Sequence, residues 1–324
     1  MTNALTMGSR GEKRRGAAAA ARRRARSARP PWDEPPTKLG QTAKGLTLGG
    51  TLAVILVPLW IIVLTSFSTP GAVNRAGGLV IWPDGLTTET YRQMLSDSTV
   101  VRALMVSLGV TVVGTVVSMI ISVLCAYGLS RSRSFGHRFI LMLLIVTMFV
   151  SGGLIPSFLV VTELGGYGQW WSLILPSAVS VFNILVLRAF YQDTSSELID
   201  AARMDGAGEW RILWSVVLPT SRAVTAVTAL FYGVGYWNSF FNVMLYMPTD
   251  SEKWPLQYVL LTYVNRGIGL PGSVNAGFGS THAQTAPLSL QMAVVVLTLV
   301  PLVIVYPFVQ KHLRAGVLTG AIKG

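Results

Sequence analysis

The chain has 324 residues, of which 51% are hydrophobic and only 12% are charged, and its mean hydropathy is +0.53. Soluble domains carry about 25% charged residues, so this composition excludes a typical water-soluble enzyme. A single cysteine, Cys125, excludes an intrachain disulfide and a cysteine-rich zinc site. The net charge of +12 is concentrated in the first 45 residues, which hold 11 basic and 3 acidic side chains.

Residues 1–44 are predicted to form a disordered basic tail. Its arginine run, Arg22–Arg26, lies in an alanine-rich stretch of a kind that can bind nucleic acid or imitate a transit peptide. The apolar segment that follows is longer than the core of a signal peptide and shows no convincing small-residue cleavage site. We therefore expect the tail to lie on anionic membrane lipid, without a nucleic-acid partner.

Six apolar stretches follow, none of which contains Asp, Glu, Lys or Arg. A helix needs about 20 apolar residues to cross a bilayer core, and each stretch is of that size. The six stretches are Leu46–Phe67, Ala103–Ser130, Phe139–Thr162, Trp170–Leu187, Ala223–Met247 and Leu288–Val309. The sequence thus predicts an all-α, polytopic membrane protein with six transmembrane helices in a domain spanning 45–324.

The distribution of basic residues predicts the orientation of this domain. With the N-terminus inside, 21 Lys and Arg residues fall on the cytoplasmic side and 5 fall outside. Without the tail the division is still 10 to 5. Because basic residues favour the cytoplasmic side, both termini are expected in the cytoplasm.

The third stretch contains Gly152, Gly153 and Pro156 near its middle, which predicts a kink or an unwound turn. Such interruptions mark binding sites in some transporters, although they also serve helix packing.

The fifth stretch carries aromatic and amide side chains at Tyr236, Trp237, Asn238 and Asn242. Aromatic rings and amides suit sugars, and these residues are candidates for a solute path. Asn can equally bond between helices, and Trp can lie in an interfacial belt.

Several kinds of chemistry are missing from the sequence. There is no Walker-type loop, and the three histidines are too far apart to suggest a metal site. The glycine fingerprint at Gly267, Gly269 and Gly272 contains Pro271 and is a chance match. The uncharged stretches argue against a proton-coupled transporter. We expect no catalytic residue, cofactor or metal.

The segment 191–220, between the fourth and fifth stretches, predicts two short helices. Thr194 and Glu197 have the spacing of a capping box, and Gly206 can adopt the left-handed conformation that ends the first helix. Pro219 is expected to stop the second helix. The apolar stripe of the second helix consists of Trp210, Leu213, Trp214 and Val217. Since helices this short are unstable alone, the stripe must be buried against the span ends, the lipid interface or a partner.

The spacing of Asp200-Ala201-Ala202, Gly206 and Val216-x-Leu218-Pro219 resembles the Glu-Ala-Ala loop of ABC importer permeases. The loop departs from the family pattern conservatively at two positions, with Asp200 for Glu and Val216 for Ile. Further stretches resemble the carbohydrate branch of this family, in its maltose-type second permease. They are Ala126–Arg131, Phe149–Pro156, Trp237–Asn242, Lys253–Gln257 and Gly316–Gly324.

The resemblance implies a bacterial cell-membrane subunit that works with a second permease, two ATPase subunits and an extracytoplasmic solute-binding protein. It implies no catalysis by this chain, whose matching loop would couple ATPase closure to sugar import. The implied coupling residues are Asp200, Ala201, Ala202, Gly206, Leu218 and Pro219, to which we add the stripe residues Trp210, Leu213 and Trp214. In the resembled system the other permease holds most solute contacts.

The outer loops Thr69–Arg102 and Pro248–Pro287, with Trp82 and Trp254, are candidate docking surfaces for the binding protein. Three alternatives remain at this point. They are an importer permease for a non-sugar solute, an ion-coupled secondary transporter, and a membrane enzyme acting on lipid-linked sugars.

Overall fold

The structure is a computed structural model that describes residues 37–96, 98–131, 136–193, 196–266 and 288–320. In these ranges the chain is helical apart from turns and one isolated bridge between Ser68 and Leu86. The predicted all-α class is therefore confirmed. The basic tail up to residue 36, Thr194 and the glycine fingerprint lie outside the described residues. The chain divides into two compact units, Met1–Leu59 and Trp60–Gly324.

In the first unit, the described residues belong to the start of helix α2 (Lys38–Ser66). The hydroxyls of Thr47 and Thr51 donate to the carbonyls of Ala43 and Thr47, so these polar groups are satisfied within the helix. The predicted boundary between tail and membrane domain, at residue 44, falls inside α2, which begins six residues earlier.

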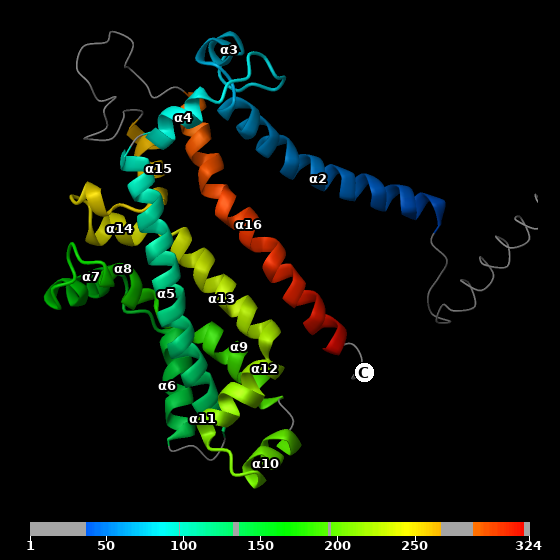
Figure 1. The fold of residues 1–324 in the computed structure, drawn as a ribbon, viewed down its shortest axis with the longest axis vertical. Coiled ribbons are helices and arrows are strands. Elements are labelled where there is room, and N and C mark those ends of the chain that lie inside the picture. The colour runs from blue at the N-terminus through cyan, green and yellow to red at the C-terminus, as the bar shows by residue number, and fades with distance from the viewer. Residues whose placement is uncertain (1–36, 97, 132–135, 194–195, 267–287, 321–324) are drawn as a thin grey trace, which may run out of the picture. The chain divides into compact units, whose positions relative to one another are not determined.

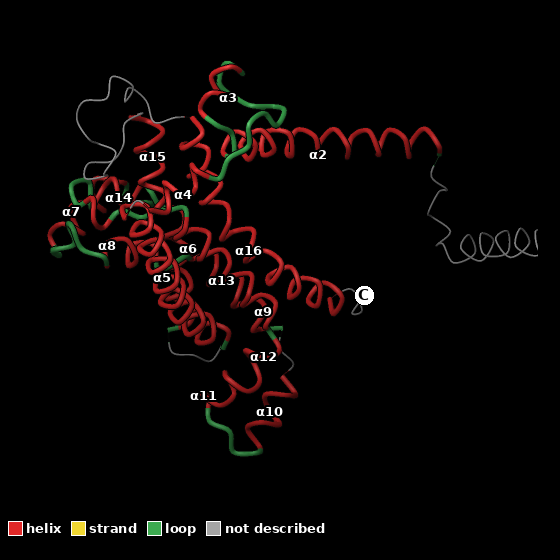
Figure 2. Tube along the Cα trace, turned by 45° about the horizontal axis from the view of Figure 1, so that its top comes forward, coloured by secondary structure: helices red, strands yellow, loops and turns green. Residues whose placement is uncertain are grey.

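The second unit is built around the long helix α5 (Ser98–Ser130). Helices α9 (Val181–Gln192) and α13 (Arg222–Trp237) pack against α5, and α16 (Leu288–Gly320) packs against α13 (Figures 1 and 2). The buried face of α5 carries a stripe of small residues, namely Ala103, Ser107, Gly114, Ser118, Ser122 and Ala126. Small residues let helix backbones approach closely in a membrane, where apolar burial against lipid gives no driving force.

Two tyrosines of α13 fill the space above this stripe. The Tyr236 hydroxyl lies 2.8 Å from that of Ser118, and the Tyr232 hydroxyl lies 2.7 Å from that of Ser122. Tyr236 also donates to the Ile174 carbonyl at 3.0 Å. Polar groups in the apolar interior are thus paired across three helical segments, which fixes the register of α13 on α5.

Among the described residues, three helices are long and apolar enough to cross a membrane without a break: Leu39–Ser66, Ser98–Ser130 and Leu288–Pro307. They correspond to the first, second and sixth predicted stretches. Three bent helix pairs would raise the number to six if each pair counted as one span. The number of six spans therefore stays a prediction, and the third, fourth and fifth stretches are interrupted helices.

The third stretch is broken between α6 (His137–Phe149) and α7 (Leu154–Glu163), whose axes differ by 117°. Gly153 has a φ of +85°, which glycine adopts without the penalty that a Cβ would bring. The predicted interruption at Gly152 and Gly153 is confirmed, and it is sharper than a kink.

The fourth and fifth stretches are also interrupted. The fourth consists of α8 (Trp171–Ile174), the 3₁₀ turn η1 (Leu175–Ser177) and α9, with a bend of 52°. The fifth ends its first helix at Trp237 and resumes as α14 (Phe241–Tyr246). The Val234 carbonyl near the end of α13 accepts both the backbone N–H and the side-chain amide of Asn238, at 3.0 and 2.9 Å.

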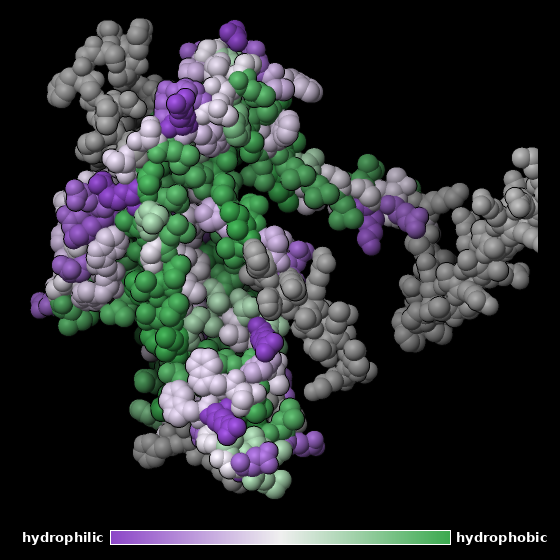
Figure 3. All heavy atoms as spheres, in the orientation of Figure 1, coloured by the Kyte–Doolittle hydropathy of each residue, from purple (hydrophilic) through white to green (hydrophobic). Residues whose placement is uncertain are grey.

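Short helical segments pack against α5, namely α4 (Glu89–Ser96), the turn η3 (Ser251–Lys253) and α15 (Leu256–Arg266). The short helix α3 (Pro70–Arg75) packs against α16. Trp82 is 80% exposed, whereas Trp254 is buried and donates to the Met247 carbonyl at 2.8 Å. Trp254 therefore holds the fold together and does not offer a docking surface. Figure 3 shows apolar side chains along α5, with polar residues gathered near both of its ends.

Candidate functional site

The candidate coupling loop, 191–220, begins with helix α10 (Ser196–Met204). Gly206 has a φ of +77° and ends this helix as predicted. Its N–H donates to the Arg203 carbonyl at 3.0 Å, and the Ala207 N–H donates to the Ala202 carbonyl at 2.9 Å. This pair of bonds is a Schellman motif, which satisfies the last carbonyls of a helix. A Cβ added at Gly206 would meet no atom within 4 Å, so only the backbone conformation requires glycine there.

The second part of the loop is one continuous helical rod. It consists of α11 (Glu209–Ile212), the π-helix η2 (Leu213–Val217) and α12 (Leu218–Thr220). The rod meets α13 at an angle of 87° across Ser221. A bend this large means that the rod runs across α13 and does not extend it.

Pro219 lies inside this rod and does not stop it, contrary to the prediction. Proline lacks an N–H and its ring collides with the carbonyl four residues back, here that of Ser215. The wider π turn just before Pro219 relieves this collision. The Thr220 hydroxyl donates to the carbonyls of Val216 and Val217, at 2.8 and 3.0 Å. The rod ends one residue after the proline, at Thr220.

The predicted apolar stripe of the rod is split between two faces. Leu213 and Val217 are buried together with Ile212, which the stripe did not include. They pack with Ile199 of α10 and with apolar residues at the adjoining ends of α5 and α9. Trp210 and Trp214 are instead 66% and 68% exposed. The predicted stripe is wrong in part because Ile212, Leu213 and Val217 form a second apolar face of the rod. This second face packs against α10 and the ends of α5 and α9.

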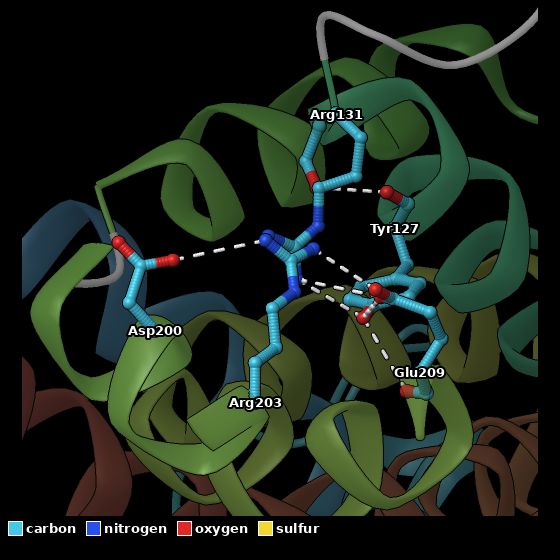
Figure 4. A network of polar contacts seen from close by, with 6 residues as sticks. Tyr127, Arg131, Asp200, Arg203 and Glu209 are labelled. Atoms are coloured by element: carbon cyan, nitrogen blue, oxygen red, sulfur yellow. Dashed lines mark hydrogen bonds and ion pairs between the residues drawn. The ribbon is translucent and has the colours of Figure 1, made fainter. Parts of the chain in front are cut away.

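A polar network fastens the loop to the end of α5 (Figure 4). The Glu209 carboxylate accepts a short hydrogen bond from the Tyr127 hydroxyl and a bond of 2.9 Å from the Arg203 guanidinium. Arg131 donates to the Tyr127 hydroxyl at 3.0 Å and lies 3.8 Å from the Glu209 carboxylate. Asp200 lies 3.7 Å from Arg203 and is exposed. The role of Glu209 could not be predicted from the sequence, because its partner Tyr127 is 82 residues away.

The same network sets the charge state of the loop. The hydrogen bond from Tyr127, followed by that from Arg203, holds the pKa of Glu209 below its ordinary value of 4.5. The neighbouring Glu209 carboxylate raises the pKa of Arg203. Both side chains are therefore charged at neutral pH. Glu209 therefore stabilises the folded protein above about pH 4.5. This stabilisation is lost as the pH falls through the lowered pKa that Glu209 has in the folded state.

The loop is joined to three helices of the second unit. It continues directly from α9 and into α13, and Glu209 binds the end of α5. In addition, the Arg188 guanidinium of α9 donates to the Leu129 carbonyl at the end of α5, at 2.9 Å. Among the described residues, no group of His, Cys, Asp or Glu side chains could hold a metal ion. The arrangement is suited to transmitting a force from the loop to the helices.

We expect Glu209→Gln to loosen this attachment without unfolding the chain. The change removes one charge from a half-exposed network, which corresponds to about 1 kcal/mol or less of stability. The thermal midpoint of the detergent-purified protein should fall by a few degrees. Asp205→Asn, at an exposed position of the same loop, is the matched control and should not lower the midpoint. Equal midpoints for both variants would contradict a fastening role for Glu209.

The candidate solute-path residues do not form one cluster. Trp237 is buried and donates to the Thr298 carbonyl of α16 at 3.0 Å, so it serves packing. Asn242 donates to the Ser177 hydroxyl at 3.2 Å. Tyr236 borders a cavity of about 240 Å³ beside the breaks of the fourth and fifth stretches. Gly152, Gly153, Pro156 and Asn238 do not line it. Its other lining residues are Ser177, Ser180, Asn183, Phe231, Tyr232, Gly235 and Ser239.

Comparison with known proteins places these features in a family. The model of the binding-protein-dependent transport system inner membrane component matches residues 118–319. Protein LplC of Bacillus subtilis is 38% identical over 281 residues, which cover 86% of this chain and 93% of that protein.

Another relative from Bacillus subtilis, the polygalacturonan/rhamnogalacturonan transport system permease protein YtcP, is 39% identical over 272 residues. These residues cover 84% of this chain and 93% of YtcP. One chain in the crystal structure of a bacterial ABC transporter involved in the import of the acidic polysaccharide alginate is 28% identical, with a TM-score of 0.76. The match covers 87% of this chain and 99% of that chain.

The matched region includes the end of α5, the loop 191–220 and helices α13 and α16. The family match extends over more than half of the chain, and LplC is well above 30% identical across most of it. The chain therefore belongs to the inner membrane components of binding-protein-dependent transport systems, the permease subunits of ABC importers.

Proposed function

We propose that this chain is the permease subunit of an ATP-driven carbohydrate importer and forms half of its translocation pathway. The observation that carries the proposal is the family membership together with the names of the relatives. These include permeases for polygalacturonan/rhamnogalacturonan, for trehalose and for diacetylchitobiose. ATP hydrolysis would belong to partner subunits.

The loop 191–220 is the proposed contact with the ATPase. Its outer surface carries Trp210 and Trp214, both about two-thirds exposed, and Met204, which is 85% exposed. Large apolar side chains this exposed on a polar loop are typical of a protein–protein interface. Asp200, Ala201, Ala202 and Gly206 lie on the adjoining helix α10. Leu213, Leu218 and Pro219 would support the ATPase contact indirectly, by keeping the rod rigid.

The proposed assembly contains a second permease, two ATPase subunits and an extracytoplasmic solute-binding protein. The chain would cross the bacterial cell membrane six times, with both termini in the cytoplasm and the basic tail on anionic lipid. This orientation puts the loop 191–220 on the same side as the ATPase. It puts the α3–α4 region, with the exposed Trp82, on the side of the binding protein.

Purification of the tagged protein in mild detergent tests this proposal. Mass spectrometry should identify an ATPase with a Walker motif and a second permease in the preparation. Uptake of labelled oligosaccharides by cells should require ATP. A homogeneous preparation without an ATPase, combined with uptake that an ionophore abolishes, would instead support an ion-coupled transporter. Competition by peptides but not by sugars would indicate an importer of another solute.

A further inference from the structure

We propose that the cavity between the breaks of the fourth and fifth stretches is a binding subsite for one uncharged sugar ring. This inference rests on the proposed carbohydrate function and adds the chemical class of sugar that this chain contacts. The subsite is defined by the lining residues Ser177, Ser180, Asn183, Phe231, Tyr232, Gly235, Tyr236 and Ser239.

The position of the subsite follows from two interrupted helices. η1 gives way to α9 at Ser180, and α13 ends just before Ser239, so both breaks open onto the same cavity. Non-helical backbone at membrane depth is tolerated only where it is buried in protein or lines a polar cavity. Discontinuous helices of this kind form substrate sites near the bilayer midplane in other transporters. Each break lies near the middle of its apolar stretch.

Asn183 is the residue that points to a ligand. Its side chain is buried, with 6% of the residue exposed, and it lines the cavity. Its backbone N–H is bonded to the Ser180 hydroxyl, but its side-chain amide makes no hydrogen bond with any residue that the structure describes. The residue as a whole is buried, but its amide atoms are accessible from the cavity, where water or a bound molecule can satisfy them. An amide both donates and accepts, as a sugar hydroxyl does.

The aromatic side chains supply the complementary apolar surface. The Tyr232 hydroxyl is already bonded to Ser122 and to the Ser180 N–H, at 2.7 and 3.1 Å. The Tyr236 hydroxyl is bonded to Ser118 and to the Ile174 carbonyl. What the tyrosines offer to a ligand is therefore mainly their rings. Phe231 is 51% exposed and adds a third ring, on which the C–H face of a pyranose can stack.

The size and charge of the cavity define the ligand further. At about 240 Å³ it is smaller than the roughly 300–1,000 Å³ of pockets for drug-sized molecules, so it holds one ring of an oligosaccharide. None of its lining residues is Asp, Glu, Lys, Arg or His. A uronate carboxylate would lose its hydration here without gaining a counter-charge. The subsite thus favours a neutral sugar over the acidic sugars that two of the similar proteins are named for.

The test uses the complete importer in cells and a mixture of isotope-labelled malto-, xylo- and cello-oligosaccharides with oligogalacturonides. Uptake of a neutral oligosaccharide is expected. Asn183→Leu should raise its KM about tenfold, and Phe231→Leu should raise it several-fold. Phe182→Leu is the matched control for the aromatic change, because Phe182 is 54% exposed on α9 but does not line the cavity. Phe182→Leu should leave KM within twofold of the wild-type value.

A second variant, Gly235→Leu, leaves the Asn183 side chain unchanged. A Cβ on Gly235 meets no atom within 4 Å, so Gly235→Leu should fill the cavity without displacing its walls. It should lower uptake at least tenfold while the importer is recovered in normal amounts. Gly109→Leu, at another open glycine in a helix, is its control.

The outcomes separate the two proposals. Uptake restricted to oligogalacturonides, or a KM that stays within twofold in Asn183→Leu and Gly235→Leu, would overturn the neutral subsite and leave the carbohydrate importer intact. Uptake of peptides or amino acids, with none of the sugars transported, would overturn the carbohydrate function itself.

Discussion

Replacing Gly206 with Val is expected to reduce solute uptake at least tenfold. Gly206 ends α10 with a φ of +77°. An L-residue in this region costs about 1–2 kcal/mol, and a β-branched residue costs more. The chain would escape this cost by rotating out of the left-handed region, which would break the Schellman bonds of Gly206 and Ala207. The direction of α10 relative to the rod would then change, and with it the surface offered to the ATPase.

Gly206→Asn is the matched variant for this prediction. Asparagine tolerates the left-handed region better than other residues with a Cβ, and a side chain at this position meets open space. We therefore expect Asn to retain most of the uptake that Val loses. The ATPase should co-purify in reduced amount with the Val variant and in nearly normal amount with the Asn variant. Wild-type uptake and a normal complex with Val would contradict the role of Gly206 in coupling.

The sequence predicted the structure best where the local backbone conformation strongly favours one residue type. Gly206 in its loop and the break at Gly153 were predicted because a positive φ strongly favours glycine. The continuous first, second and sixth helices were predicted from the length of their apolar stretches alone. Pro58 lies inside α2, and Pro301 and Pro307 lie inside α16, without ending these helices.

Features that depend on tertiary contacts could not be predicted in this way. Trp210 and Trp214 have the helical spacing of a buried stripe, but packing against α5 and α9 leaves them exposed and buries Ile212 beside Leu213 and Val217. Asn183 lies in an apolar stretch and looks like a packing residue in the sequence. Its role becomes visible only when two interrupted helices, about 50 residues apart, open onto one cavity.

The packing of α13 on α5 gives the second large prediction, Gly114→Ala. An added Cβ would lie 2.8–2.9 Å from three atoms of the Tyr236 ring, closer than real contacts allow. The ring cannot move freely, because its hydroxyl is bonded to Ser118 and to the Ile174 carbonyl. Overpacking of this kind costs about 1–3 kcal/mol. The thermal midpoint of the purified protein should fall by several degrees, and the yield of folded protein should fall with it.

Gly109 provides the control within the same helix. A Cβ there meets no atom within 4 Å, so Gly109→Ala adds helix propensity without a collision. Its thermal midpoint should stay the same or rise. The double variant Gly114→Ala with Tyr236→Leu should recover part of the stability lost by Gly114→Ala when it is compared with Tyr236→Leu alone. If Gly109→Ala and Gly114→Ala change the thermal midpoint equally, α5 and α13 do not approach each other as closely as the structure shows. If only Gly114→Ala lowers the thermal midpoint, the ring of Tyr236 is held in place by its hydrogen bonds. The same bonds fix the ring as a wall of the proposed sugar subsite.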